Sequence, residues 1–525
     1  MRKKHFMILV ICALLYIPNL GSANASFYLP DSSGIELQWE YTETPPKRPY
    51  PRLLNSAQYA VKWKLDNPLM FEIVEDRNGI IYISDSDNRV LALYPNGQEK
   101  WSTQLASDQD LSVFNLHLGN DGTLYAYSSN TLYQGGGTTV FALSEDGAIK
   151  WKLESDNIFS RFEGNFSGDV SGNLIYFTNE GLVSRNAQGD INWINGDITT
   201  SPPVEYKGHQ AQVYTDLQGN IYVDNNKQQI ISLDPEGNER WTSQPQKHLD
   251  SFNAFHPFFS GTGSIYMLTE KGLHGLDSRN GQNRKAASLF DYNDIRYSGI
   301  PTDGQGGYYI SIRGSVQKID ANGNSKWMYT PRESEKYGVG SLKPLATDSK
   351  GNVYFPTGVG NIIGLDSEGQ EIFVFLRNGF WHRITEIVIG ANDNIYSISH
   401  DIGIVAFGLK GVQVYSDNLP LPLSVKPINE KGTVLVPFRS LFEAYGMKVV
   451  WDSSSKKITG SKEGLQLELS IGSRTAYVNG NAMELTEAPR IANGSTYVPL
   501  RFIGESLKKK VSWDGKSQFV NIDPD

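Results

Sequence analysis

Apolar and polar residues alternate in a phrase that recurs along the middle of the chain. In the clearest copy, Gly79-Ile80-Ile81-Tyr82 is followed by Val90-Leu91-Ala92-Leu93, a turn at Asn96-Gly97, and then Lys100-Trp101. Short alternating segments separated by Gly turns are typical of β-strands joined in hairpins. Each copy therefore predicts a small antiparallel sheet.

Copies of this phrase recur at a regular distance. Their anchor tyrosines are separated by 43, 51, 46, 44, 43, 45 and 42 residues, and the longest spacing contains an insertion around Gly135-Gly136-Gly137. The anchors are Tyr82, Tyr125, Tyr176, Tyr222, Tyr266, Tyr309, Tyr354 and Tyr396. A period near 44 residues with short strands is typical of a β-propeller, in which each repeat forms one blade.

The tryptophans that end the phrase indicate how the ring closes. This position is filled by Trp63, Trp101, Trp151, Trp193, Trp241 and Trp327, and in weaker copies by Lys285 and Phe373. Trp63 precedes the first anchor and Tyr396 follows the last Trp-type position, so pairing their strands would leave no open edge. We therefore predict a mainly β protein with an eight-bladed propeller over 54–415, with seven blades and a degenerate segment as the alternative.

Turns of the form D-x-x-G recur with the repeat. In each, Asp caps the turn and Gly adopts the positive φ of a tight hairpin, so we interpret them as structural. They are Asp216 to Gly219, Asp234 to Gly237, Asp320 to Gly323, Asp348 to Gly351 and Asp366 to Gly369.

The phrase resembles the quinoprotein-type (PQQ-like) propeller repeat. Asn220–Val223 and Ile231–Trp241 carry the pattern of that family well. The resemblance covers about 360 residues. It implies the propeller fold, but the family mixes redox enzymes with scaffolds and binding proteins. Its alcohol dehydrogenases use adjacent cysteines against the quinone, whereas the only cysteine here is Cys12. We therefore expect no PQQ cofactor.

Other arrangements that could carry chemistry are weak. The histidines show no H-x-H or H-x-x-x-H spacing, and no G-x-S-x-G elbow occurs. Asp85–Asn88 resembles part of a calcium loop but lacks its Gly and distal Glu, so a hairpin turn is expected. Gly135–Gly137 is expected to be a hairpin tip. Phe380–Arg383 is an aromatic cluster that packs between blades or forms a ligand platform. We expect no catalytic, cofactor-binding or metal-binding residues.

The first 25 residues have the pattern of a secretory signal peptide. Arg2, Lys3 and Lys4 precede an apolar run from Phe6 to Ile17. The small residues around Ala25 predict cleavage before Ser26. Cys12 would leave with this segment. Residues 26–53 contain several prolines and are expected to form an irregular lead-in.

A different duplication begins after the Pro-rich segment at 416–423, which we interpret as a linker. Val434–Glu443 matches Thr496–Glu505 at an offset of 62 residues, and Trp451 and Trp513 keep that offset. Each half predicts a strand, a short helix and a strand. Pro437 and Pro499 suit the first helical position, and Gly446 suits a helix end. Residues 424–525 are therefore predicted to be a small duplicated α+β domain.

This duplicated segment resembles the domain named for the N-terminal region of copper amine oxidases, also called a stalk domain. The resemblance implies an extracellular accessory module of the kind appended to secreted proteins of Gram-positive bacteria. Its role would be that of a spacer or of an attachment to cell wall or polysaccharide. Copper is not expected, because the sequence after Leu419 contains no histidine.

The net charge of the chain narrows the classes of molecule that it is expected to bind. The net charge of −9 becomes −12 once the basic signal peptide is removed, so nucleic acid is an improbable partner. Residues Pro420–Asp525 carry 14 Lys and Arg against 11 Asp and Glu. No later segment is apolar enough to span a membrane. We predict a secreted, non-catalytic binding or scaffolding protein at the bacterial cell surface, with a protein or cell-wall polysaccharide as partner. The alternative is a PQQ-dependent dehydrogenase-like or glycan-active propeller enzyme.

Overall fold

The computed structural model describes residues 52–524 with gaps, of which the longest are 107–113, 130–137, 156–165, 199–212, 246–257, 285–300, 332–344 and 377–383. The predicted signal peptide, with its cleavage site at Ala25 and Ser26, lies outside the described residues, as does most of the predicted lead-in. Residues 51–525 form one compact unit. The first strand of the described residues is the short β1 (Arg52–Leu54), which pairs with β29 (Glu371–Leu376).

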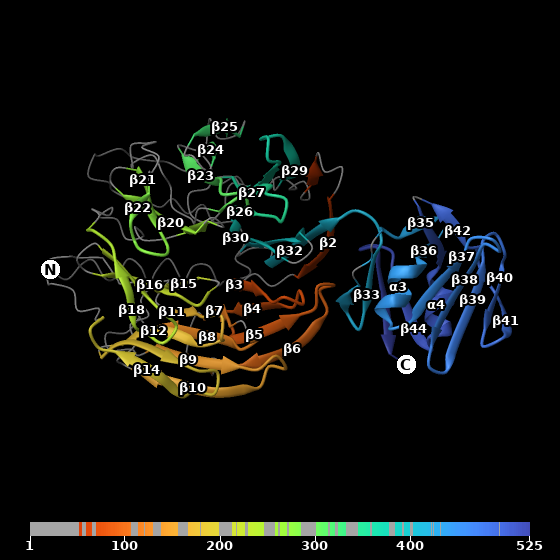
Figure 1. The fold of residues 1–525 in the computed structure, drawn as a ribbon, viewed down its shortest axis with the longest axis horizontal. Helices are drawn as coiled ribbons and strands as arrows, with labels where there is room; N and C mark the ends of the chain where they lie inside the picture. The colour runs from red at the N-terminus through yellow and green to blue at the C-terminus, as the bar shows by residue number, and fades with distance from the viewer. Residues whose placement is uncertain are drawn as a thin grey trace, which may run out of the picture. The chain divides into compact units, whose positions relative to one another are not determined.

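The repeat region forms eight antiparallel sheets, each made largely from strands that follow one another in the chain (Figure 1). We number them in chain order. Sheets 1 to 4 contain β3 (Met70–Glu75), β4 (Ile81–Asp85), β5 (Arg89–Leu93) and β6 (Glu99–Gln104); β7 (Asn115–Leu118), β8 (Leu124–Ser129), β9 (Thr138–Leu143) and β10 (Ile149–Ser155); β11 (Phe166–Gly168), β12 (Leu174–Thr178), β13 (Gly181–Arg185) and β14 (Ile191–Asn195); and β15 (Val213–Thr215), β16 (Ile221–Asn225), β17 (Gln229–Leu233) and β18 (Glu239–Thr242).

Two of the remaining four sheets recruit a strand from the start of the described chain. Sheets 5 to 8 contain β19 (Phe258–Ser260), β20 (Ser264–Thr269), β21 (Gly272–Asp277) and β22 (Asn283–Arg284); β23 (Tyr308–Ile312), β24 (Ser315–Ile319) and β25 (Ser325–Tyr329); β26 (Ala346–Thr347), β27 (Val353–Pro356), β28 (Ile362–Leu365) and β29 (Glu371–Leu376) with β1 (Arg52–Leu54); and β30 (Ile384–Ile389), β31 (Ile395–Ser399) and β32 (Gly403–Leu409) with β2 (Tyr59–Leu65).

Buried side chains join most of the sheets to the next one. One apolar cluster combines Tyr82 and Ala92 of sheet 1 with Leu116 and Phe141 of sheet 2. Similar clusters connect sheets 2 and 3, 3 and 4, 4 and 5, 6 and 7, and 7 and 8. A further cluster packs Ile81 of sheet 1 against residues of sheet 8, so the last sheet meets the first. This is the packing of a β-propeller, whose blades bury their faces against one another. The number of blades stays a prediction.

The outermost strand of sheet 8 comes from the other end of the repeat region. Strand β2 pairs antiparallel with β32 from Tyr59 opposite Leu409 to Leu65 opposite Ile404. The two strands lie side by side in Figure 1. Trp63 and Tyr396 therefore belong to the same sheet, as the sequence predicted.

The C-terminal domain comprises β33 to β45 with two helices. Its elements are β33 (Gln413–Ser416), β34 (Leu419–Pro420), β35 (Ile428–Glu430), β36 (Thr433–Pro437), α3 (Phe438–Ala444), β37 (Lys448–Asp452), β38 (Lys457–Lys462), β39 (Leu465–Ser470), β40 (Thr475–Val478), β41 (Asn481–Glu484), β42 (Arg490–Ala492), β43 (Ser495–Pro499), α4 (Leu500–Ser506), β44 (Lys509–Asp514) and β45 (Phe519–Pro524).

The duplication is visible in this order, because β36–α3–β37 matches β43–α4–β44. Strands β36 and β43 pair antiparallel with each other. One detail differs from the expectation: Pro437 and Pro499 are the residues before each helix rather than its first residues. Their ψ angles of 115° and 127° are extended, so both prolines end a strand and the helix begins one residue later. Gly446, with φ 70°, follows α3 as expected.

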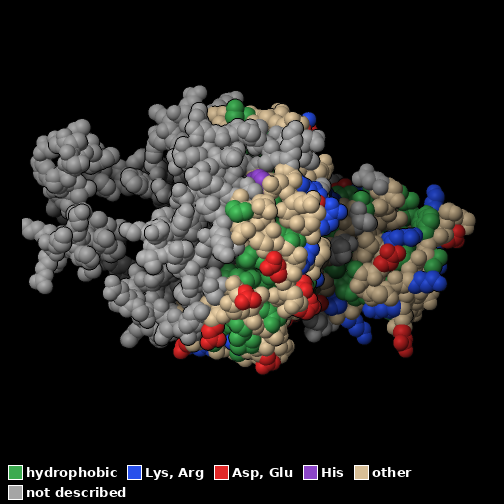
Figure 2. Space-filling view, turned by 60° about the vertical axis from the view of Figure 1, so that its left-hand side comes forward, with side chains coloured by type: hydrophobic (Ala, Val, Ile, Leu, Met, Phe, Trp, Pro, Cys, Tyr) green, Lys and Arg blue, Asp and Glu red, His purple; other side chains and the backbone are tan. Residues whose placement is uncertain are grey.

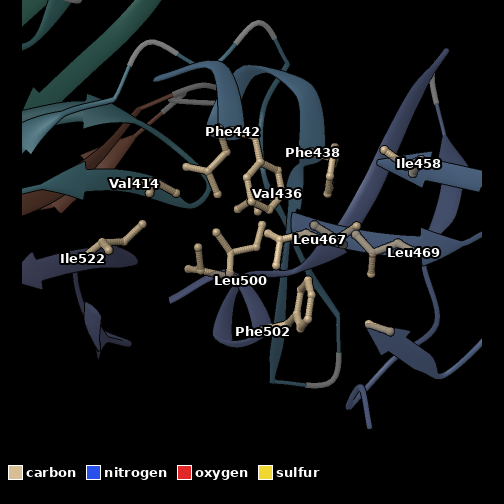
Figure 3. Close-up of a cluster of buried hydrophobic side chains, with 14 of the residues drawn as sticks. Val414, Val436, Phe438, Phe442, Ile458, Leu467, Leu469, Leu500, Phe502 and Ile522 are labelled. Carbon is tan, nitrogen blue, oxygen red and sulfur yellow. The ribbon is translucent and has the colours of Figure 1, made fainter. Parts of the chain in front are cut away.

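One hydrophobic core holds the domain together. Side chains from both helices and several strands point toward one another in Figure 3, among them Phe442, Leu467 and Leu500. Val414 of β33 lies in the same core, because β33 pairs in parallel with β45. The predicted linker at 416–423 thus includes the last residue of β33 and all of β34. The predicted domain boundaries stay predictions.

Candidate functional site

The tryptophans of the repeat connect neighbouring sheets. Trp101 of sheet 1 donates a hydrogen bond from Nε1 to the carbonyl oxygen of Glu145 in sheet 2 at 2.8 Å. Its ring lies against Gly147, where an added Cβ would come within 2.6 Å of the indole. We call this arrangement a tryptophan clasp. It recurs in the described residues at Trp63 on Gly97, Trp151 on Gly189, Trp193 on Gly237, Trp241 on Gly281 and Trp327 on Gly369.

The rings of the anchor tyrosines pack against the indole rings of the clasp tryptophans. The rings of Tyr125 and Trp151 are 5.9 Å apart, and similar distances of 5.8–5.9 Å separate Tyr82 and Trp101, Tyr222 and Trp241, Tyr309 and Trp327, and Tyr396 and Trp63. Among the anchors, Tyr176 and Tyr354 are also buried, whereas Tyr266 is only partly buried and its ring lies 5.8 Å from that of Tyr308. The repeat residues are therefore used to pack one sheet on the next.

Aspartates of the D-x-x-G turns complete this framework. Asp216 Oδ1 accepts backbone N–H groups of Gln218 and Asn220 at 2.9 Å each, and its Oδ2 accepts the hydroxyl of Tyr222 at 2.8 Å. Asp348 binds its own turn and the Tyr354 hydroxyl in the same way. Burial, together with the nearby carboxylate, raises the pKa of Tyr222. These aspartates therefore cap turns and hold the anchor hydroxyls.

Sheets 7 and 8 meet without a tryptophan clasp. Phe373 occupies the Trp-type position and contacts the rings of Tyr59 and Phe407, with centroids at 5.5 and 5.2 Å. The hydroxyls of Tyr59 and Tyr354 lie 2.8 Å apart. An aromatic cluster therefore replaces the indole hydrogen bond here. Lys285, the other weak copy, lies outside the described residues.

A partly buried histidine was not singled out by sequence reasoning. His117 lies opposite Tyr125 in the ladder of β7 and β8 and packs against Gly168 of sheet 3. Burial lowers the pKa of His117 to about 4, so the imidazole is neutral at pH 7. Phe166 occupies the same place opposite Tyr176 in the next sheet. The register of the first strand of each sheet shows that His117 and Phe166 are equivalent. The sequence pattern does not define this register.

Of the other candidate motifs, the structure describes only the turn at Asp85–Asn88. Asp85 accepts the N–H groups of Asp87 and Arg89 and forms an ion pair of 2.8 Å with the Arg89 guanidinium. It therefore closes the expected hairpin turn. Gly135–Gly137 and Phe380–Arg383 lie outside the described residues.

The structure and the sequence offer few ligands for a metal. Within the described ranges, no group of three or more His, Cys, Asp or Glu side chains could hold a metal ion. The sequence after Leu419 has neither His nor Cys, so the C-terminal domain does not fit a copper site of imidazole or thiolate ligands. The predicted absence of PQQ stays a prediction. In the part of the chain that the structure describes, no helix has the length and apolar character needed to cross a membrane.

Comparison with known proteins identifies both parts of the chain. Residues 86–298 match a family described as outer membrane protein assembly factor BamB, and residues 415–522 match the copper amine oxidase N-terminal domain. A curated protease inhibitor from Brevibacillus choshinensis is 33% identical over 87 residues, which are 16% of this chain and 27% of that protein. The chain thus spans about a quarter of that relative.

One solved structure has a similar propeller fold, and a second was matched less well. The C-terminal WD40 domain of Sif2 matches with a TM-score of 0.52 at 11% identity, covering 68% of this chain and 99% of that one. BamB from Moraxella catarrhalis matches with a TM-score of 0.45 at 16% identity, covering 68% of this chain and 100% of that one. The chain therefore combines a segment similar to the BamB assembly factor family with a segment similar to the copper amine oxidase N-terminal domain.

Proposed function

We propose that this protein is a secreted, non-catalytic binding or scaffolding protein of the bacterial cell surface. The propeller serves as the interaction platform, and the C-terminal domain is a spacer or wall attachment. The observation that carries the proposal is the use of the repeated residues. The indoles, anchor hydroxyls and turn carboxylates described above bind neighbouring sheets or their own turns. The repeat therefore supplies a stiff platform, and binding specificity is left to the surface.

The composition of the described surface supports this proposal. On the face shown in Figure 2, acidic, basic and hydrophobic side chains are interspersed over the described residues. A mixed surface of this kind suits polar, specific contacts with a protein or glycan rather than insertion into lipid. The match of 86–298 to an assembly factor family also favours a role in holding other proteins.

A binding experiment tests the platform. Residues 26–525 are immobilised and incubated with proteins secreted by a Gram-positive bacterium and, separately, with purified cell walls. We expect saturable retention of a defined partner, with no turnover of it. Tight binding of PQQ with Ca²⁺, followed by dye-linked alcohol oxidation, would instead support the enzyme alternative and overturn the proposal.

The attachment role of the C-terminal domain is tested separately. Lys508, immediately before β44, and Lys510, within it, are exposed, so they can meet anionic wall polymers. We expect the double variant Lys508→Gln and Lys510→Gln to bind purified cell walls more weakly. Lys150→Gln and Lys326→Gln, two exposed lysines of the propeller, remove the same charge as a control. Equal loss in both double variants would leave the domain as a spacer.

A further inference from the structure

One lysine is buried where its counterparts are exposed or, at Lys100, partly exposed. In several sheets the residue before the clasp tryptophan lies in a β-bulge, where the register of the outermost strand shifts. This residue is exposed at Lys150, Asn192, Arg240 and Lys326. The equivalent residue of β2 is Lys62, which is only 6% exposed. Another part of the chain therefore covers Lys62 in sheet 8 but leaves the equivalent residues of these other sheets exposed.

The cover is the C-terminal domain. The Lys62 ammonium donates to the carbonyl oxygen of Ser517, in the turn between β44 and β45, at 3.2 Å. It also donates to the carbonyl oxygen of Gly411 at 3.3 Å and lies 5.4 Å from the centre of the Phe519 ring. Burial lowers the pKa of Lys62 to about 8. Removing the ammonium group from water costs free energy, and the contacts with the two carbonyl oxygens and the aromatic ring offset part of that cost.

A second contact lies at the neighbouring sheet. Asn96, in the turn between β5 and β6, donates from Nδ2 to Asn418 Oδ1 at 2.8 Å. Asn521 of β45 donates to the same oxygen at 2.8 Å and accepts the Asn418 backbone N–H at 3.1 Å. The backbone N–H of Gln98 binds Asn96 Oδ1. These backbone bonds fix the orientation of the Asn96 and Asn521 amides, so the bridge has one polarity.

Both contacts lead to the same strand. Lys62 is itself part of β2, and the turn that carries Asn96 is the turn on which Trp63 of β2 is clasped, through Pro95 and Gly97. Strand β2 is the strand that closes sheet 8, where it pairs antiparallel with β32. We propose that the C-terminal domain locks the closing strand β2 in place, so that it is a structural part of ring closure and not an independently hinged spacer.

Hydrogen exchange of the full chain tests the lock. Asn96→Asp keeps the acceptor for the Gln98 N–H but places an oxygen against Asn418 Oδ1. Asp already stands at this turn position in sheet 2, as Asp146. Asn521→Asp breaks the bridge from the side of the C-terminal domain. In both variants we expect amides of 59–65 to exchange about five-fold faster, as expected for a local opening eased by one polar contact.

The controls separate a lock from general destabilisation. Asp146→Asn makes the reverse change at the turn of sheet 2 and leaves exchange of 59–65 unchanged. Amides of β8 provide the internal reference and keep their wild-type rate in every variant. The proposal is overturned if 59–65 exchanges at the wild-type rate in both bridge variants. It is equally overturned if β8 and β2 accelerate together.

Discussion

The rings of Trp63 and Tyr396 lie 5.9 Å apart, so the first clasp tryptophan and the last anchor tyrosine pack in one sheet. The same Trp63 donates its indole hydrogen bond to Pro95 of sheet 1 at 2.9 Å. Its side chain therefore connects the closing sheet to the sheet that follows it in space and begins the repeat in sequence.

Trp63→Phe keeps an aromatic ring over Gly97 but removes the bond to Pro95. Because a buried hydrogen bond contributes about 1 kcal/mol net, we expect the free energy of unfolding to fall by about that amount, with a further loss from the smaller ring. The denaturant midpoint measures the effect. Trp513→Phe, at an indole that is 42% exposed, is the control and leaves the midpoint nearly unchanged. Equal midpoints for wild type and Trp63→Phe would contradict a stabilising clasp.

Gly147→Ala tests the close approach at a clasp. The backbone of Gly147 has φ +85°, and an added Cβ would lie 2.6 Å from the Trp101 ring. Gly472 has a similar φ of +81° but no atom within 4 Å of an added Cβ. We expect Gly472→Ala to cost only backbone strain of about 1 kcal/mol, and Gly147→Ala to cost clearly more. Similar thermal midpoints for the two variants would show that the ring yields without cost.

His117 predicts a loss of stability in mild acid. The folded protein holds its pKa at about 4, whereas the ordinary value is 6.5. Between these values the unfolded chain binds a proton that the folded chain does not, so stability falls as pH decreases from 6.5 and levels off below about 4. His117→Phe copies the residue found at Phe166 and is expected to flatten this part of the curve of thermal midpoint against pH. An unchanged slope would assign the acid sensitivity to other groups.

Lys62 predicts a similar rise of stability with pH in mild alkali. Its pKa in the folded protein is about 8, below the ordinary 10.5, so the unfolded chain binds more protons between these values. Stability from this residue therefore rises as pH increases from 8 toward 10.5. Lys62→Met removes that rise, whereas Lys326→Met, at the exposed equivalent position, retains it. Buried tyrosines such as Tyr82, whose pKa is raised by burial, oppose the trend above pH 10, so the comparison is made between pH 8 and 10.

Much of the fold could be predicted because each repeat places the same residue types at the same positions. The anchor tyrosine, the turn glycine and the clasp tryptophan each recur at a fixed distance, and the orphan Trp63 and Tyr396 indicated the closure. The duplication at Val434 and Thr496 likewise predicted both strand–helix–strand units. The helix starts were misplaced by one residue, because the sequence pattern does not distinguish a proline that ends a strand from one that begins a helix.

The junction residues could not be predicted in the same way. Lys62 precedes a tryptophan as Lys100, Lys150 and Lys326 do, so its sequence context gives no sign of burial. Its environment is made by Ser517 and Phe519, which are distant in the chain. Asn96 and Asn418 are ordinary turn residues when taken singly. The tertiary approach of separate segments, which local patterns do not encode, gives these residues their role.

The pairing of β2 with β32 also sets the order of assembly. Strand β2 is among the first parts of the repeat region to be synthesised, and its partner is the last, so no local hairpin can form between them. Such a non-local contact costs chain entropy before it returns any stability, and it slows folding. Sheets 1 to 7 can assemble progressively behind an unpaired leading strand. Pairing of that strand must wait until the chain has been synthesised through Leu409.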